Sequence, residues 1–188
     1  MSVYQIKNIF GEYKNILPIS PDAQRTLVDN YGSPLQESWN TISFKWDFED
    51  GSESRDAFLY LGSILITSEK LKTSLQGVLK NNRVEYLPIT IEGEVFFVIN
   101  VCDTLDCVLN IRQSKIEYFK DRHIKWINEF VFDPIPDCPN LFHISEISTP
   151  IFASDCFIKA YEETGCIGLK FIECRQSRQG FLKSMFKK

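Results

Sequence analysis

Two stretches decide the fold of this chain: Ser-Ile-Leu-Ile-Thr-Ser-Glu-Lys-Leu-Lys (residues 63–72) and Pro-Ile-Phe-Ala-Ser-Asp-Cys-Phe-Ile-Lys (residues 150–159). In both, a short apolar run typical of a strand reaches a serine, and an acidic residue and helically spaced apolar residues follow it. Ser68 and Ser154 are suited to accept a hydrogen bond from an amide of the first helical turn, and the acid after each complements the helix dipole. Each stretch therefore predicts a strand that leads directly into a capped helix.

Outward from these two units, alternation of apolar and polar side chains predicts further strands. Residues 42–49 alternate strictly, and residues 84–91 and 95–101 flank Glu92-Gly93-Glu94 as a hairpin. A second hairpin is predicted from 116–119 and 124–132, with short strands over 141–144 and 167–172 and a glycine C-cap at Gly165. Within residues 1–40 only a helix from Pro21 to about Tyr31 is predicted, and the rest is expected to be irregular. Consecutive hairpins favour an α+β fold with a largely antiparallel sheet.

Length and composition bound the class of protein. The 188 residues are 44% hydrophobic and 13% aromatic, which excludes a disordered chain and is enough to bury a core, so a single domain over 1–188 is expected. No apolar run approaches the roughly 20 residues of a membrane span, and the first residues lack the apolar core of a signal peptide. We therefore expect a cytoplasmic protein without a membrane partner.

Cysteine spacing agrees with that compartment. The six cysteines, at positions 102, 107, 138, 156, 166 and 174, include no C-x-x-C pair, and only His123 and His143 could assist them in binding a metal. We expect reduced thiols and neither metal nor cofactor.

Charge is distributed unevenly along the chain. Residues 1–174 carry 16 basic and 25 acidic side chains, a net −9, whereas residues 175–188 carry five basic side chains and no acid. An acidic body of this size disfavours nucleic acid and favours a cationic partner.

The sequence holds no motif of an established catalytic class: neither a nucleophile elbow, a phosphate-binding loop, a dinucleotide fingerprint nor a zinc-protease helix is present. Cys138 and His143 are spaced so that they could pair as nucleophile and base, but nothing supplies a third, orienting group. Asp103 and Asp106 could form a carboxylate pair, although aspartates after a strand are commonly turn formers. No residue is therefore assigned a catalytic role.

A resemblance rests on the order and spacing of several segments over about residues 30–173: Gly32-Ser-Pro-Leu35 with Trp39, Asp56–Leu59, Ile64–Leu71, Val84–Ile89, Phe96–Val101, Leu105-Asp106 with Ser114, Leu141-Phe-His143, the second strand–Ser–Asp unit and Thr164–Leu169. In this order the chain resembles the immunity proteins of bacterial polymorphic toxin systems, specifically the eleventh-named immunity family, formerly a domain of unknown function. The resemblance implies a cytoplasmic, non-catalytic protein that binds a cognate toxin domain and blocks it. It does not cover the first 30 residues or the basic tail.

Two functions from different classes follow from the sequence. The first is a toxin-neutralising protein whose acidic body suits a basic toxin, with Trp46, Asp47, Phe48, Glu49, Asp50 and Glu53 as the predicted partner-binding residues. Strict alternation allows another interpretation of this segment, in which its apolar row faces the core. The second function is a small cytosolic enzyme that uses cysteine or aspartate chemistry in a pocket between sheet and helices.

Overall fold

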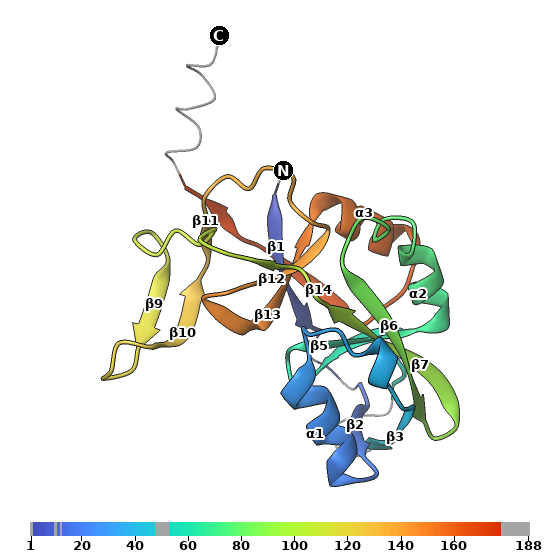
Figure 1. Ribbon diagram of the computed structural model, residues 1–188. Coiled ribbons are helices and arrows are strands. Elements are labelled where there is room, and N and C mark those ends of the chain that lie inside the picture. Colours follow the sequence, from blue (N-terminus) through green and yellow to red (C-terminus); the bar gives the residue numbers. More distant parts are fainter. Residues whose placement is uncertain (1, 10, 12, 48–52, 178–188) are drawn as a thin grey trace.

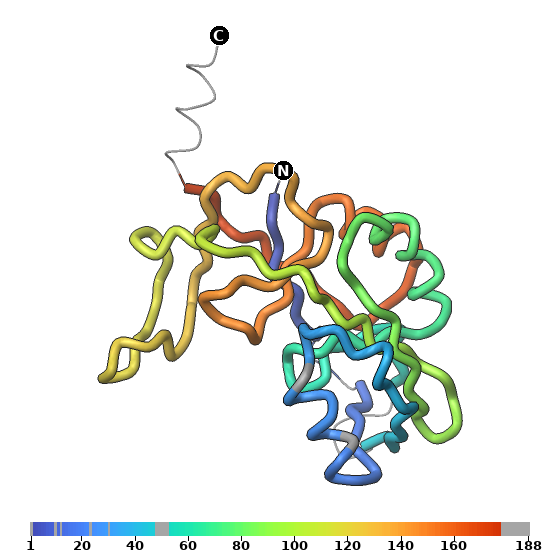
Figure 2. Tube along the Cα trace, viewed as in Figure 1, coloured from blue at the N-terminus to red at the C-terminus, as the bar shows by residue number. Residues whose placement is uncertain are grey.

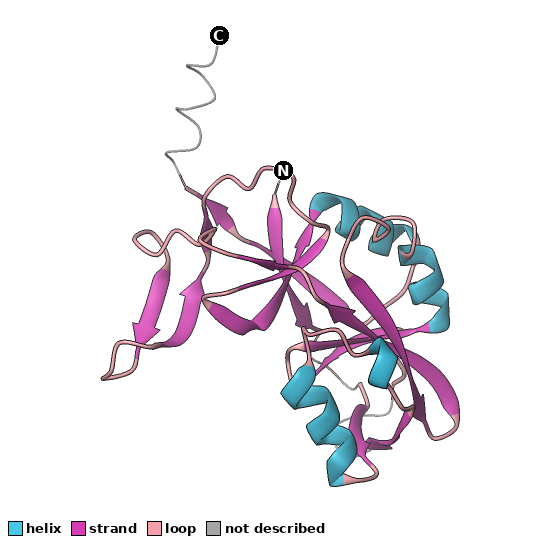
Figure 3. Ribbon diagram, viewed as in Figure 1, coloured by secondary structure: helices cyan, strands magenta, loops and turns pink. Residues whose placement is uncertain are grey.

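A computed structural model describes residues 2–9, 11, 13–47 and 53–177 of the chain (Figure 1). Strands far outnumber helices, and antiparallel pairing dominates the sheets (Figure 3). The helices are α1 (Pro21–Asn30), α2 (Glu69–Leu75) and α3 (Asp155–Glu163), with a short 3-10 turn at Gln36–Ser38. Within the described ranges, no helix is both long and apolar enough to cross a membrane.

The larger sheet has six strands, antiparallel except where β3 pairs with β6. Their spatial order is β2 (Asn15–Pro18), β3 (Ile42–Asp47), β6 (Val84–Ile91), β7 (Glu94–Val101), β5 (Ile64–Ser68) and β4 (Ala57–Tyr60). The predicted hairpin around Gly93 joins β6 and β7, and Gly93 has the positive φ of 89° that a tight turn requires.

The second sheet has five strands, antiparallel except where β8 pairs with β12. Their order is β14 (Leu169–Glu173), β1 (Val3–Asn8), β13 (Ile147–Ser154), β12 (Leu141–Ile144) and β8 (Thr104–Leu105). Two strand pairs complete the described fold: antiparallel β9 (Lys115–Tyr118) with β10 (Ile124–Glu129), and parallel β11 (Val131–Phe132) with β15 (Arg175–Gln176).

The two sheets contain the same five-element unit. In the first, the order β4–β5–β7–β6 is built from a hairpin, helix α2 and a second hairpin. In the second, β12, β13, α3 and β14 follow the same course, but β1 from the start of the chain occupies the place that β7 has in the first. The repeated sequence pattern at Ser68 and Ser154 thus marks a structural repeat. In the second copy, the strand equivalent to β7 is β1, which comes from the start of the chain.

Equivalent hydrogen bonds hold the two units at their helix starts. Ser68 Oγ accepts the amide of Leu71, and Ser154 Oγ accepts the amide of Phe157, each at 3.4 Å. Each serine also contacts the side chain that precedes its unit: Ser68 Oγ donates to Asp56 at 3.4 Å, and Ser154 Oγ donates to Asn140 at 2.5 Å. Ser68 and Ser154 are therefore the N-cap residues of α2 and α3, and each helix begins at the acidic residue that follows.

The loop after each helix is tied to the other unit. Asp56 Oδ2 accepts the amide of Ile167, which follows α3, while Asn140 Nδ2 donates to the carbonyl of Val78, which follows α2. At the first junction the chains approach so closely that a Cβ on Gly168, whose φ is +125°, would lie 1.9 Å from the carbonyl oxygen of Ala57. A side chain is therefore excluded at position 168.

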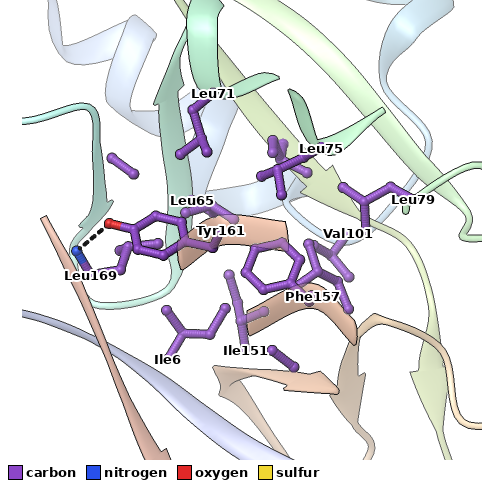
Figure 4. Packing of buried hydrophobic residues seen from close by; sticks show 14 of the residues in the cluster. Ile6, Leu65, Leu71, Leu75, Leu79, Val101, Ile151, Phe157, Tyr161 and Leu169 are labelled. Atoms are coloured by element: carbon purple, nitrogen blue, oxygen red, sulfur yellow. Dashed lines mark hydrogen bonds between the residues drawn. The ribbon is translucent and has the colours of Figure 1, made fainter. Parts of the chain in front are cut away.

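A central hydrophobic cluster lies where the two units meet, beneath the neighbouring helices α2 and α3 (Figure 4). Six of its fully buried members form three equivalent pairs from the two units: Leu65 with Ile151, Leu71 with Phe157, and Ile99 with Ile6. Tyr161 joins the cluster through its ring, and its hydroxyl accepts the amide of Leu169 at 3.2 Å. Each large apolar side chain buried in this way contributes about 1.5–3 kcal/mol.

The outer face of each sheet carries a further apolar cluster under its own cover. Leu27 of α1 covers the six-stranded sheet and lies in one buried cluster with side chains of that sheet, Ile16 of β2 among them. Ile127, Phe130 and Phe132 cover part of the five-stranded sheet. The tube in Figure 2 shows that the β9–β10 hairpin then projects from the body instead of continuing across this sheet. The layer on the outer face of the five-stranded sheet therefore leaves part of that sheet uncovered.

Two sequence-based expectations need correction. Outside the predicted helix, residues 1–40 are not irregular, because they contain β1 and β2. The burial pattern of β1 lacks strict alternation because its two buried residues, Val3 and Ile6, lie on opposite faces of the strand and join different clusters. The strand predicted over 124–132 is also divided, since β10 ends at Glu129 and β11 starts at Val131.

Candidate functional site

The predicted partner-binding segment is only partly available to a partner. Trp46 is 9% exposed and packs edge-on against Phe96, so the apolar row of β3 faces the core and the ring of Trp46 offers little surface to a partner. Asp47 is half-buried at the end of β3, and Glu53 is exposed. Phe48, Glu49 and Asp50 lie outside the described residues.

The candidate carboxylate pair is divided between two roles. Asp103 Oδ2 accepts the amide of Arg83 at 2.8 Å and the side-chain amide of Asn82 at 3.0 Å, which fixes the chain after β7. Asp106 is exposed, and no hydrogen bond joins it to Asp103 among the described residues. Asp103 thus has a structural role, because its carboxylate stabilises the loop that follows β7.

The candidate thiol–imidazole pair is not assembled either. Burial, assisted by the charge of Asp155, raises the pKa of Cys138 to about 11, which leaves its thiol protonated at neutral pH. His143 is buried, its Nδ1 donates to the carbonyl of Pro150 at 3.0 Å, and its ring meets that of Tyr31 edge-on. Burial lowers the pKa of His143, against the opposing effect of the Pro150 and Ser148 carbonyls. Over the described part of the chain, no group of three or more metal-ligating side chains is found.

The structure instead presents an open cavity of about 490 Å³ on the outer face of the five-stranded sheet, at the place that its cover leaves free. We call this cavity the groove. Its lining residues come from four parts of the chain: Gln5–Asn8 of β1, Leu59, Leu61 and Gly62 of the β4–β5 hairpin, Trp126, Ile127 and Phe130 in and after β10, and Ile147, Thr149 and Pro150 of β13.

The floor of the groove opens because two neighbouring strands pair over only part of their length. The register of β1 with β13 covers Val3 to Gln5, and the second half of β1 pairs with β14 alone. Pro150 stands in β13 where that pairing has ended, and proline has no amide hydrogen to offer a neighbouring strand. The parts of β1 and β13 that do not pair with each other line the groove.

The β4–β5 hairpin forms one wall of the groove, and the side chain of Asn8 attaches this hairpin to β1 with two hydrogen bonds to its backbone. Asn8 Nδ2 donates to the carbonyl of Leu59 at 2.9 Å, and the amide of Leu59 donates to Asn8 Oδ1 at 2.7 Å. The hairpin turn that follows has two residues of positive φ, Leu61 at 51° and Gly62 at 77°. Leu61 is left 54% exposed beside the groove.

The opposite wall belongs to the β9–β10 hairpin, residues 115–129, which we call the arm (Figure 1). Three aromatic side chains of the arm are about half exposed: Tyr118 at 48%, Phe119 at 54% and Trp126 at 51%. At the base of the arm, hydrogen bonds from Lys115 and Arg175 lower the pKa of the Glu129 carboxyl, which joins the arm to β15. Trp126 is the exposed aromatic residue that faces the groove.

The groove has a distinctive charge. Lys7 is its one charged lining residue, and this side chain has no hydrogen-bond or ion-pair partner among the described residues. Its cross-strand neighbour on β14 is Lys170, so two lysines share this face of the sheet. The groove is therefore apolar with a cationic floor, in a body that carries net negative charge.

Sequence reasoning did not find the groove. It lies where β1 and the β4–β5 hairpin, neither of which was predicted, meet the predicted hairpin that contains β9 and β10. The only local signals were Trp126 in a segment rich in charge and Pro150 inside a strand.

Comparison with protein-family models finds none that matches this chain, and comparison with curated proteins likewise yields no match.

Proposed function

We propose that this chain is a binding protein that neutralises a cognate toxin domain by direct contact in the bacterial cytoplasm, as the immunity proteins that it resembles do. The observation that carries the proposal is the pairing of the open groove with exposed aromatic side chains along the arm. Exposed aromatic residues beside an apolar hollow are typical of surfaces that bind other proteins, because tyrosine and tryptophan supply much of the energy of interface hot spots.

The acidic body supports a basic toxin as the partner. Residues 1–174 carry a net charge of −9, and opposite charge on a partner increases the rate of encounter. Asp47 and Glu53 remain candidates for this long-range attraction, while the groove and the arm supply the close contacts. In this proposal the acidic body attracts the toxin, and the groove and the arm hold it in the complex.

The test is co-expression with the C-terminal domain of a toxin encoded next to this chain, scored by growth rescue and by co-purification. We expect rescue by the wild-type chain and a stable complex. Trp126→Ala should weaken both, whereas Cys138→Ser should leave both unchanged, because the proposal gives that thiol no part. Rescue that required Cys138, or rescue without any complex, would contradict a binding function and favour an enzyme.

A further inference from the structure

We propose that the groove binds a segment of the partner in which a bulky apolar side chain stands next to a carboxylate. The apolar side chain enters between Trp126 and Leu61, and the carboxylate pairs with Lys7. This inference rests on the proposed function, and it identifies the chemistry of the contact at the groove.

The dimensions and lining of the groove suit one such segment. Its volume of about 490 Å³ falls in the range of about 300–1,000 Å³ typical of binding pockets, and its lining is mostly apolar with few polar groups. Trp126 and Leu61 line the groove from two different hairpins and are each about half exposed, so a side chain in contact with both would remove apolar surface of both from water.

Contacts between neighbouring elements support both the β4–β5 hairpin and the base of the arm in the chain without a partner. The two hydrogen bonds between Asn8 and Leu59 attach the hairpin that carries Leu61 to β1, and the Glu129–Arg175 ion pair links the base of the arm, which carries Trp126, to β15. A preformed site loses less conformational freedom on binding, so a small contact contributes more to affinity.

The charge of Lys7 determines which group is favoured beside the bound apolar side chain. Lys7 lacks a hydrogen-bond or ion-pair partner among the described residues, so a carboxylate at this position would supply one to its ammonium group. A basic segment would meet both lysines and be rejected. The groove thus recognises a local acidic feature on a partner whose overall charge is opposite to that of the acidic body.

The first experiment measures the dissociation constant of the complex with the toxin domain for matched variants. Trp126→Ala should weaken binding about tenfold or more, as loss of an aromatic anchor does, and Lys7→Glu should weaken it about tenfold. Val95→Ala and Lys80→Glu truncate an exposed apolar side chain and reverse an exposed lysine at positions outside both the groove and the arm, and should change affinity less than threefold. Raising the salt concentration should reduce the difference between wild type and Lys7→Glu.

A loss of affinity in Lys7→Glu should not result from misfolding of the variant. Lys7→Glu replaces a like-charge cross-strand pair with an attractive one, so we expect an unchanged or higher melting temperature. A carboxylate on the toxin whose reversal to lysine restores binding to Lys7→Glu would identify the contact directly. Complex formation that is indifferent to both Trp126→Ala and Lys7→Glu would overturn the inference while leaving the proposed function intact.

A second experiment needs no toxin. Amide NMR shifts of the 188-residue chain are followed during titration with acetyl-Ala-Leu-Asp-Ala-amide and with its Ala-Leu-Lys-Ala counterpart. We expect the aspartate peptide alone to shift the signals of Lys7, Gly62 and Trp126. Equal shifts with both peptides would overturn the inference, as would decanoate binding at least a hundredfold more tightly than the aspartate peptide, which indicates a small-molecule site. Groove shifts without any toxin complex would support the ligand chemistry inferred for the groove and contradict the proposed function.

Discussion

Asn8 and Leu59 are joined as two paired strands are: the side-chain amide of Asn8 donates to the Leu59 carbonyl at 2.9 Å, and its oxygen accepts the Leu59 amide at 2.7 Å. One side chain thereby connects the five-stranded sheet to the β4–β5 hairpin of the six-stranded sheet. Leu59 is only 5% exposed, so its backbone groups have no easy replacement in water.

Asn8→Ala should therefore lower the free energy of unfolding by about 2 kcal/mol, since two hydrogen bonds are lost and two buried backbone groups are left unpaired. Urea denaturation measures the change. Asn81→Ala, at an exposed position, is the control and should stay within about 0.5 kcal/mol of wild type. Equal effects of the two substitutions would show that the Asn8 bonds do not hold the junction.

The two helix caps should differ in strength. Ser154 is fully buried and is bonded to Asn140, so Ser154→Ala should cost about 2 kcal/mol, at the upper end of measured caps. Ser68→Ala should cost about 1 kcal/mol, because Ser68 is more exposed and its bond to Asp56 is longer. Thermal and urea unfolding of both variants test this order, and the reverse order would contradict it.

Gly168→Ala should be among the most damaging single changes in the chain. The new methyl group would overlap the carbonyl oxygen of Ala57, and alanine is strained at a φ of +125°. We expect a loss of at least about 3 kcal/mol, measured by urea unfolding. Gly77→Ala is the matched control, because a Cβ there meets nothing within 4 Å; it should be neutral or slightly stabilising.

Stability should decrease as the pH falls below about 6.5, the pKa of an unperturbed histidine. Burial lowers the pKa of His143 in the folded protein, so the unfolded chain takes up the proton first. Above that pH the ring is neutral in both states and contributes no dependence. Urea unfolding between pH 5 and 8 should show this slope in wild type and in His123→Gln, which changes an exposed histidine. The slope between pH 6.5 and 5 should flatten in His143→Gln.

All six cysteines lie in the described ranges and are free, and they should react in a defined order. Cys107 and Cys156 are exposed and should react with a thiol reagent within the dead time of a native assay. Burial raises the pKa of Cys174 to about 12, so this thiol should react only after unfolding, together with buried Cys102 and Cys166. Fewer than six thiols in denaturant without reductant would contradict the expectation of a reducing compartment.

Some features followed from the sequence alone because they depend on neighbours in the chain. The caps at Ser68 and Ser154 and the turn at Gly93 each involve groups within a few residues, so local pattern was enough to predict them. The burial of Phe44 and the exposure of Lys45 likewise follow from alternation along one strand.

The tertiary structure alone decided where β1 belongs and what surface it makes. This strand completes a unit whose other strands begin more than 130 residues later, and no local pattern specifies such a pairing. Trp46 and Trp126 show the same limit: both stand in strands beside charged residues, yet one packs in the core and the other lines the groove. Sequence determines which side chains share a face of a strand, but the partner that covers that face is chosen by long-range packing.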